Sequence, residues 1–425
     1  MLYRLKKDAH VRCYEGAGYI TSTGLNKRNT VDESGAVFLG ALAHEGQTLD
    51  ALADKLLAVF KGVDRETILP DAREFYDNLA AEGFLVKGES DAELDASDTK
   101  TGWNLPQDKD TVHFFLPGLN LEFLGFNVYL AQYMQRHPER FMANIRPAAF
   151  YGSFNNAIWQ GGRSMIGAQP SPLEIETAIQ RINDAGIAVR YTYTNNRIEE
   201  KHLNDTFCNL TMELANNGRN EVLVNSPVLE GYLRKNYPDF KYILSTTACE
   251  RNIDRINEAT KKYDLVVIDF RDNRDMDFLA KIQDKDKIEI LVDDYCPSFC
   301  RFRKKHYDIV SRVNLYQGNP SEGECLETNR PKNIRGFYQN LETYSDTNLT
   351  SEEIYGKYRD MGFRNFKLIG RDDRSLFTFE SYMYYLVRPE WRDRVRDELI
   401  GYYVDYIIRY YGGNKTVLLD QPVKQ

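Results

Sequence analysis

The chain has 425 residues, of which 42% are hydrophobic and 28% are charged, and its formal net charge is −8. This length predicts two domains, and the negative charge argues against a dominant nucleic-acid function because phosphate binding needs a basic face. No apolar run approaches the roughly 20 residues of a membrane span, and the start MLYRLKKDAH has no apolar signal core, so we expect a cytoplasmic protein without a membrane partner.

Residues 1–88 predict a small first domain. A good N-cap, Thr48, precedes the apolar-periodic run LDALADKLLAVF, and Gly83 ends the next helix. Small strands, three helices and a last strand together predict a winged helix-turn-helix. The predicted elements are strands over residues 2–12 and 14–23, helices that begin near Ser34, Thr48 and Arg65, and a closing strand over residues 84–86.

The same residues carry a resemblance. An acidic turn and an apolar helix, followed by EGQTLDALADKL and DAREFYDNLAAEGFLV, resemble the PqqD-like domains, the recognition elements for precursors of ribosomally synthesised and post-translationally modified peptides (RiPPs). The resemblance implies that the domain binds the leader segment of a precursor peptide, added as a strand to the wing sheet beside the third helix. The alternative is a winged helix that binds DNA, but the acids of DAREFYDNLAAEG disfavour contact with phosphate.

Residues 89–110 predict a linker, because the stretch is acidic, rich in Ser, Asp and Gly, and has no apolar period. Trp103 and Leu105 are expected to pin it to one of the domains. At the other end of the chain, residues 401–425 predict an amphipathic helix and a tail, which cover either the floor of the second domain or a partner.

Residues 111–400 alternate between apolar strands and amphipathic helices, which predicts an α/β domain. Eight strands with helices between them predict a (β/α)8 TIM-like barrel, with a doubly wound open sheet as the alternative. The strands are predicted at residues 112–116, 148–152, 189–193, 221–224, 242–244, 265–269, 288–292 and 366–369.

Polar residues at nearly all of the strand ends favour the barrel, because a barrel mouth requires a polar ring. For any single Asn, a turn or a helix cap is the alternative. The polar ends are Asn120, Asn155, Asn156, Asn195, Asn196, Asn225, Ser226, Thr246, Thr247, Asp269, Arg271, Asp293, Asp294 and Arg371.

Five of these residues form the predicted catalytic set. Asp293 and Asp294 end the seventh strand and are candidates for a general base or for holding a cationic group, although acids there also make good helix caps. Arg371 ends the last strand and offers a planar fork for a carboxylate, with a surface salt bridge as the alternative. Asp269 and Arg271 stand in the same way at the end of the sixth strand.

A second resemblance covers about residues 111–385. The segments HFFLPGLNLEFL, AAFYGSFNNAIW, IAVRYTYTNN, EVLVNSPVLEGYL and NFKLIGRDDRSLFTFESYMYYLV are similar to the collagenase-like peptidase family, which also contains prephenate-dependent RNA hydroxylases and ubiquinone hydroxylation proteins. This likeness implies a barrel whose Gly-Arg pair lines the cavity, and a [4Fe–4S] cluster on four cysteines. The histidine of the family's HGALC-like strand is replaced here by Asp-Asp-Tyr, so neither peptidase nor hydroxylase activity carries over directly.

The cysteines predict a metal or redox centre, because six thiols in so long a chain do not make a disulfide scaffold. Cys296, Cys300 and Cys325 stand where the resemblance implies ligands of an iron–sulfur cluster, and Cys249 is the candidate for the fourth ligand. Zinc held with the help of His306 is the alternative. Ordinary buried thiols are another.

These observations predict a RiPP maturation protein. Its first domain binds the leader of a precursor peptide, and its barrel modifies the core peptide, with an iron–sulfur redox change of the hydroxylation type as the expected reaction. A peptidase that cuts the precursor is one alternative. A non-catalytic escort that presents the peptide to a separate enzyme is the other.

Overall fold

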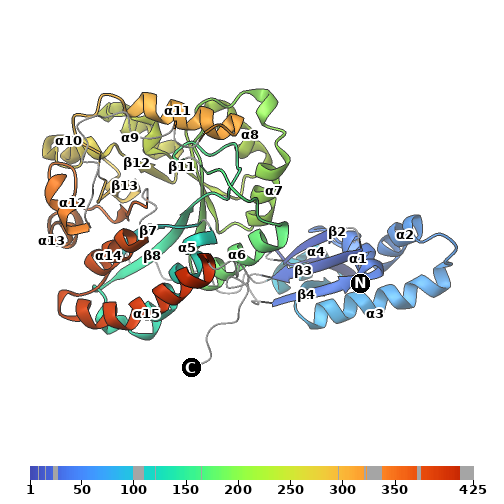
Figure 1. Cartoon of the computed structure of the whole chain (residues 1–425). Coiled ribbons are helices and arrows are strands. Elements are labelled where there is room, and N and C mark those ends of the chain that lie inside the picture. Colours follow the sequence, from blue (N-terminus) through green and yellow to red (C-terminus); the bar gives the residue numbers. More distant parts are fainter. Residues whose placement is uncertain are drawn as a thin grey trace. The chain divides into compact units, whose positions relative to one another are not determined.

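The computed structural model describes residues 1–7, 9–14, 16–22, 27–98, 110–119, 121–163, 165–294, 296–319, 322, 337–370 and 375–411. The chain divides into two compact units, residues 1–106 and 107–425 (Figure 1). Each unit buries a hydrophobic core of its own.

The first unit contains two small antiparallel sheets within the described residues. In one sheet β1 lies between β5 and β6, and in the other β3 lies between β2 and β4. The strand β4 directly precedes the first helix and was missed by sequence analysis. The strands are β1 Leu2–Leu5, β2 Ala9–Tyr14, β3 Ala17–Ser22, β4 Lys27–Asp32, β5 Gln47–Thr48 and β6 Leu85–Gly88.

Three helices of this unit begin where the sequence predicts them, because each has a side-chain cap. The side chains of Asp32, Thr48 and Asp64 each accept a hydrogen bond from the backbone N–H three residues on. Apolar residues at helical spacing, such as Leu52 and Ile68, are buried in the core. The helices are α1 Glu33–Gly40, α2 Leu49–Val59 and α3 Arg65–Ala81.

Part of the predicted linker is folded. Helix α4, Asp91–Ser97, begins at the cap Ser90 and buries Leu94 completely. Arg4 of β1 forms ion pairs with Asp95 and Asp98. The predicted linker therefore contains a helix that its lack of an apolar period did not reveal, because a single buried leucine and a cap suffice where tertiary contacts supply the rest. Trp103 and Leu105 lie outside the described residues.

The second unit is a closed barrel of eight parallel strands, which confirms the predicted fold (Figure 1). Neighbours along the chain pair in order, and the last strand returns to the first, with Phe366 beside Phe114. The strands are β7 Val112–Pro117, β8 Ile145–Gly152, β9 Ala188–Tyr193, β10 Glu221–Val224, β11 Lys241–Leu244, β12 Leu265–Val267, β13 Ile288–Leu291 and β14 Asn365–Lys367.

Helices follow the strands and surround the barrel. Helix α6 shows why they form: Ser171 and Glu174 make a capping box, Pro172 takes the first position, and Ile175 and Ile179 face the core. The helices are α5 Leu121–Arg136, α6 Pro172–Asp184, α7 Thr206–Ala215, α8 Pro227–Asn236, α9 Ile253–Lys262, α10 Met276–Ala280, α11 Arg303–Tyr316, α12 Phe337–Thr343, α13 Ser351–Glu353, α14 Ser375–Leu386 and α15 Arg392–Tyr411.

The C-terminal helix α15 begins at Arg392, earlier than the predicted residue 401. Its Tyr402 stacks on Tyr129 of α5 at 3.8 Å between ring centroids, and Tyr403 packs edge-on against Phe126 of the same helix. The helix therefore covers the outer face of α5 and not the barrel floor. Among the helices of the described residues, none is both long and apolar enough to cross a membrane.

Charged side chains fill a layer of the barrel interior. Arg190 of β9 is completely buried and forms ion pairs with Glu221 of β10 and Glu289 of β13. The Nζ of Lys367 on β14 lies 3.6 Å from Glu289 Oε1. Two cations thus face two carboxylates, and each buried charge has an opposite charge beside it.

Candidate functional site

Asp293, one of the two acids that end β13, binds neighbouring groups of the barrel with both of its carboxyl oxygens. Its side chain is buried, Oδ1 accepts a hydrogen bond from the N–H of Ile369 at 2.8 Å, and Oδ2 accepts one from the Ser381 hydroxyl at 2.7 Å. Burial raises the pKa of Asp293 to about 7. This carboxyl group ties the end of β13 to the end of β14 and to α14.

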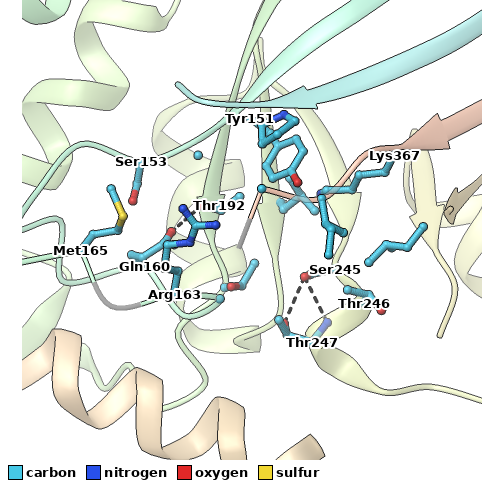
Figure 2. A pocket seen from close by; sticks show the side chains of 18 of the residues that line it. Tyr151, Ser153, Gln160, Arg163, Met165, Thr192, Ser245, Thr246, Thr247 and Lys367 are labelled. Atoms are coloured by element: carbon cyan, nitrogen blue, oxygen red, sulfur yellow. Dashed lines mark hydrogen bonds between the residues drawn. The ribbon is translucent and has the colours of Figure 1, made fainter. Parts of the chain in front are cut away.

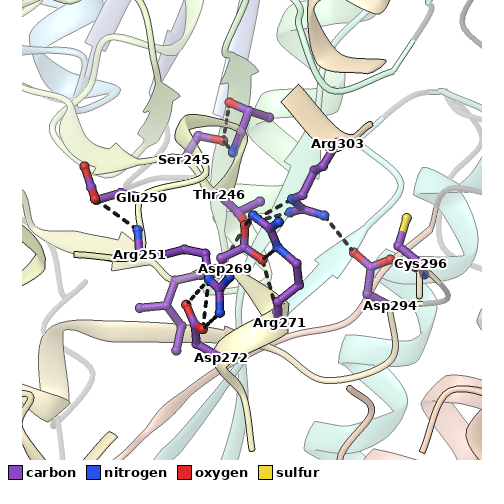
Figure 3. Close-up of polar contacts among 12 residues, drawn as sticks. Ser245, Thr246, Glu250, Arg251, Asp269, Arg271, Asp272, Asp294, Cys296 and Arg303 are labelled. Atoms are coloured by element: carbon purple, nitrogen blue, oxygen red, sulfur yellow. Dashed lines mark hydrogen bonds and ion pairs between the residues drawn. The ribbon is translucent and has the colours of Figure 1, made fainter. Parts of the chain in front are cut away.

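The other predicted acids meet one buried arginine, Arg303 (Figure 3). The guanidinium of Arg303 lies 3.4 Å from Asp269 Oδ2 and 3.8 Å from Asp294 Oδ2, and it donates a hydrogen bond to the Thr246 hydroxyl at 2.9 Å. The other oxygen of Asp294 accepts a hydrogen bond from the N–H of Cys296. We call these five residues the Arg303 network.

Asp269 is held ionised within this network. Burial opposes its ionisation, but hydrogen bonds from Arg271 and the charge of Arg303 outweigh burial and keep the pKa of Asp269 below its usual value. Arg271 binds both oxygens of Asp269, at 2.8 and 2.7 Å. The structure therefore brings Asp269, Arg271 and Asp294 to the same end of the barrel, as sequence analysis expected. Their charged groups form ion pairs with one another or with Arg303.

The described cysteines do not assemble a metal site. Cys296 and Cys300 are buried after β13, while Cys249 adopts a left-handed backbone conformation after β11, where burial raises the pKa of its thiol. Among the described residues, no three His, Cys, Asp or Glu side chains are placed to share a metal ion. Cys325 and Arg371 lie outside the described residues, so a cluster or zinc site that includes Cys325 stays a prediction.

A cavity of about 700 Å³, its open side included, lies at the carboxyl ends of the barrel strands (Figure 2). In a closed α/β barrel this is the end where ligands bind. The lining comes from β7, β8, β9, β10, β13 and β14 and from the segments that follow β7, β8, β9, β11 and β14. Its hydroxyl groups come from Ser153, Thr192, Thr194, Ser245, Thr246 and Thr247.

Among the described residues that line the cavity, two carry a cationic side chain, Arg163 and Lys367 (Figure 2). The Lys367 Nζ lies 4.0 Å from the centroid of the Tyr151 ring, and the Tyr151 hydroxyl donates to the carbonyl of Leu368 at 2.6 Å. Among the described residues that line the cavity there is no Asp or Glu. The arrangement is suited to binding and orienting an anionic or strongly polar group.

Sequence analysis pointed to the carboxyl ends of the strands, where the cavity lies, but it missed most of the residues that line the cavity. Of the polar strand ends, Thr246 and Thr247 line it. Asn195 instead donates hydrogen bonds to the carbonyls of Ile158 and Ser311, and other polar ends, such as Ser226, cap helices. The sequence did contain a signal for the cavity, because polar residues such as Lys367 interrupt the apolar strands. Alternate positions of a barrel strand face the interior, so such residues are candidates for the cavity lining.

Comparison with known proteins gives one family match. Residues 25–85 match the family described as "Coenzyme PQQ synthesis protein D (PqqD)". The first unit contains a PqqD domain. The match begins just before β4 and ends at β6, so this PqqD domain includes α1, α2 and α3 and the strands around them.

The barrel is not identified by these comparisons. No curated protein matches the chain. Among solved structures, the U32 peptidase Mk0906 is similar with a TM-score of 0.37 and 13% sequence identity, over 62% of this chain and 94% of its own. The barrel fold itself rests on the closed strand order.

Proposed function

We propose that this chain is a RiPP maturation protein in which the PqqD domain binds the leader of a precursor peptide and the barrel cavity receives a residue of the core peptide. The observation that carries the proposal is the PqqD match over residues 25–85, in one chain with a barrel that has a cavity at its mouth. Leader binding keeps the core peptide at a high effective concentration near the barrel.

The open edge of β4 is the proposed leader site. Within the described residues β4 pairs with β3 alone, which leaves its other edge free for an added strand. The side chain of Asn29 on β4 donates a hydrogen bond to Glu82 at the end of α3, so this strand lies near the end of α3. Thr30 of β4 is exposed.

The direction of the backbone groups on β4 follows from the strand register. Tyr14 pairs with Ala17 across the turn, and along an antiparallel strand the backbone groups alternate between the two neighbours. This alternation directs Ala17 toward β2 and Gly18 toward β4, where Gly18 pairs with Val31. The N–H of Thr30 is therefore expected on the open edge, where a leader strand would bind it.

Two substitutions at one position test the leader site. Thr30→Pro removes an outward N–H without removing a bond to β3, so leader binding should fall at least tenfold, while Thr30→Ala retains the N–H and should bind like the wild type. Isothermal titration with candidate precursor peptides encoded beside the gene measures both. Equal affinity of the two variants would contradict leader binding at this edge.

The action on the core peptide is tested by mass spectrometry of the same precursor after incubation with the protein. We propose a chemical modification, which appears as a small mass increment. Truncation identifies a peptidase, and retained binding without any mass change identifies an escort. Iron–sulfur chemistry within this proposal depends on Cys325 joining Cys296 and Cys300, and iron and sulfide analysis of protein purified without oxygen tests it.

A further inference from the structure

We propose that the barrel cavity is a binding site for a carboxylate group, held between Arg163 and Lys367. These two side chains lie on different sides of the cavity and both reach into it (Figure 2). Arg163 comes from the segment after β8, and Lys367 comes from β14. A carboxylate between a guanidinium and an ammonium group forms charge-assisted hydrogen bonds with both.

The balance of charge around the cavity favours an anion. Arg190 and Lys367 are offset by Glu221 and Glu289 in the layer below. Arg163 is an additional cation, and in the part of the chain that the structure describes no carboxylate pairs with it. A low-dielectric wall makes such a cation a stronger attractor than it would be at an open surface.

Two buried hydroxyl groups lie beside the proposed carboxylate site. Ser153 and Thr194 line the cavity, and their residues are 0% and 2% exposed. Within the described residues, neither Ser153 Oγ nor Thr194 Oγ1 has a hydrogen-bond partner. Both oxygens are covered in the structure, and buried hydroxyls are ordinarily paired. A rotation of either side chain toward the cavity would give its O–H group a ligand oxygen to bond.

The remaining lining points to a carboxylate on a carbon skeleton in preference to a phosphate. Pro117, Leu223, Leu291 and Ile369 contribute apolar surface to the cavity, which suits the carbon part of the ligand. The carboxylate has two possible sources with the same chemistry. It belongs either to an acidic side chain of the peptide or to a free small carboxylic acid.

The test uses the full chain and matched pairs of probes. Acetyl-glutamate methylamide with acetyl-glutamine methylamide represents the peptide source, and 4-phenylbutyrate with 4-phenylbutyramide represents the free acid. Saturation-transfer NMR detects binding and titration gives the affinity. We expect at least one acid to bind at least tenfold more tightly than its amide, and added salt to weaken it. Preference for the glutamate probe assigns the peptide source, and preference for phenylbutyrate assigns the free acid.

Substitutions in the cavity show whether the acid probes bind there. Arg163→Gln removes the half-buried cation and should weaken binding of the acid at least tenfold, and Ser153→Ala should weaken it by a smaller factor. Arg255→Gln is the matched control, because its side chain is 76% exposed on α9 and pairs with Glu250, and it should leave binding unchanged. Unchanged affinity in Arg163→Gln, or equal binding of acids and amides, would overturn the proposal.

The inference stands apart from leader binding. The probes carry no leader, so a chain that binds them and yet fails to bind any precursor would refute the proposed function and retain the carboxylate site. Lys367→Met is a second test of the cavity, but it also removes a partner of buried Glu289. Arg163→Gln and Ser153→Ala therefore decide the question if Lys367→Met does not fold.

Discussion

Two groups of polar residues lie at the same end of the barrel and differ in one respect. The Arg303 network joins Asp269, Asp294 and Thr246 to one guanidinium, with Cys296 bound to Asp294, and its charged groups pair with one another. The cavity offers Arg163, which has no carboxylate partner in the described part of the chain, and the hydroxyl groups of Ser153 and Thr194, which have no hydrogen-bond partner there. Buried charges that neutralise one another indicate architecture, whereas a cation without a carboxylate beside a cavity indicates a ligand.

The largest effect on stability is expected from Arg303→Met. Removing this side chain leaves Asp269 and Asp294 buried without their shared cation, and breaking a buried ion pair in this way costs about 3–5 kcal/mol. Chemical denaturation measures the free energy of unfolding. Arg255→Met is the control and should change it by less than about 0.5 kcal/mol. A loss below about 1 kcal/mol in Arg303→Met would show that the network is not structural.

The next effect is a pH dependence from Asp293. Its folded pKa is about 7, above its ordinary value, so between about pH 4 and pH 7 the folded state binds more protons than the unfolded state. The contribution of Asp293 is therefore full below about pH 4, falls as pH rises, and levels off above pH 7.

Asp293→Asn removes this dependence, because an amide does not ionise and can still bond Ile369 and Ser381. Relative to wild type, the variant should gain about 2–4 kcal/mol between pH 4 and pH 7. Denaturation at several pH values measures the difference. The variant is compared with the wild type at each pH, because burial also raises the pKa of Asp184 to about 7 and Asp184 is present in both proteins. A difference that does not change with pH would contradict the assignment.

A smaller effect is expected where the two groups meet, at Thr246. Its hydroxyl accepts from Arg303 and donates to the carbonyl of Ile268, and Thr246 also lines the cavity. Thr246→Val should lower the free energy of unfolding by about 1–2 kcal/mol, since Arg303 retains both acids. Thr246→Ser keeps the hydroxyl and serves as the control. A loss as large as that of Arg303→Met would mean that Thr246 holds the network together.

The smallest effect on stability is expected from Arg163→Gln, the same variant that should lose carboxylate binding. Because no described carboxylate depends on Arg163, the free energy of unfolding should change by less than about 0.5 kcal/mol. If Arg303→Met loses stability and Arg163→Gln loses binding, the two groups of residues have separate roles. Loss of stability in Arg163→Gln would place this arginine with the architecture.

Local sequence was sufficient for most of the secondary structure. Residues 65 to about 81 were predicted as a helix, and α3 has those bounds because a capping aspartate precedes it and Gly83 follows it. All eight barrel strands were found as short apolar runs that end in polar residues. Apolar period, caps and turn residues are properties of neighbouring positions, so they can be read without knowing the fold.

The roles of the polar residues were decided only by tertiary structure. The sequence places Asp269 and Asp294 at strand ends, but only the tertiary structure shows that Arg303, which begins the helix after β13, pairs with both. Lys367 and Arg163 are 204 positions apart in the sequence, and barrel closure brings both to one cavity. Which side chains face a cavity depends on strand register and on closure of the barrel, and both are set by contacts between distant segments.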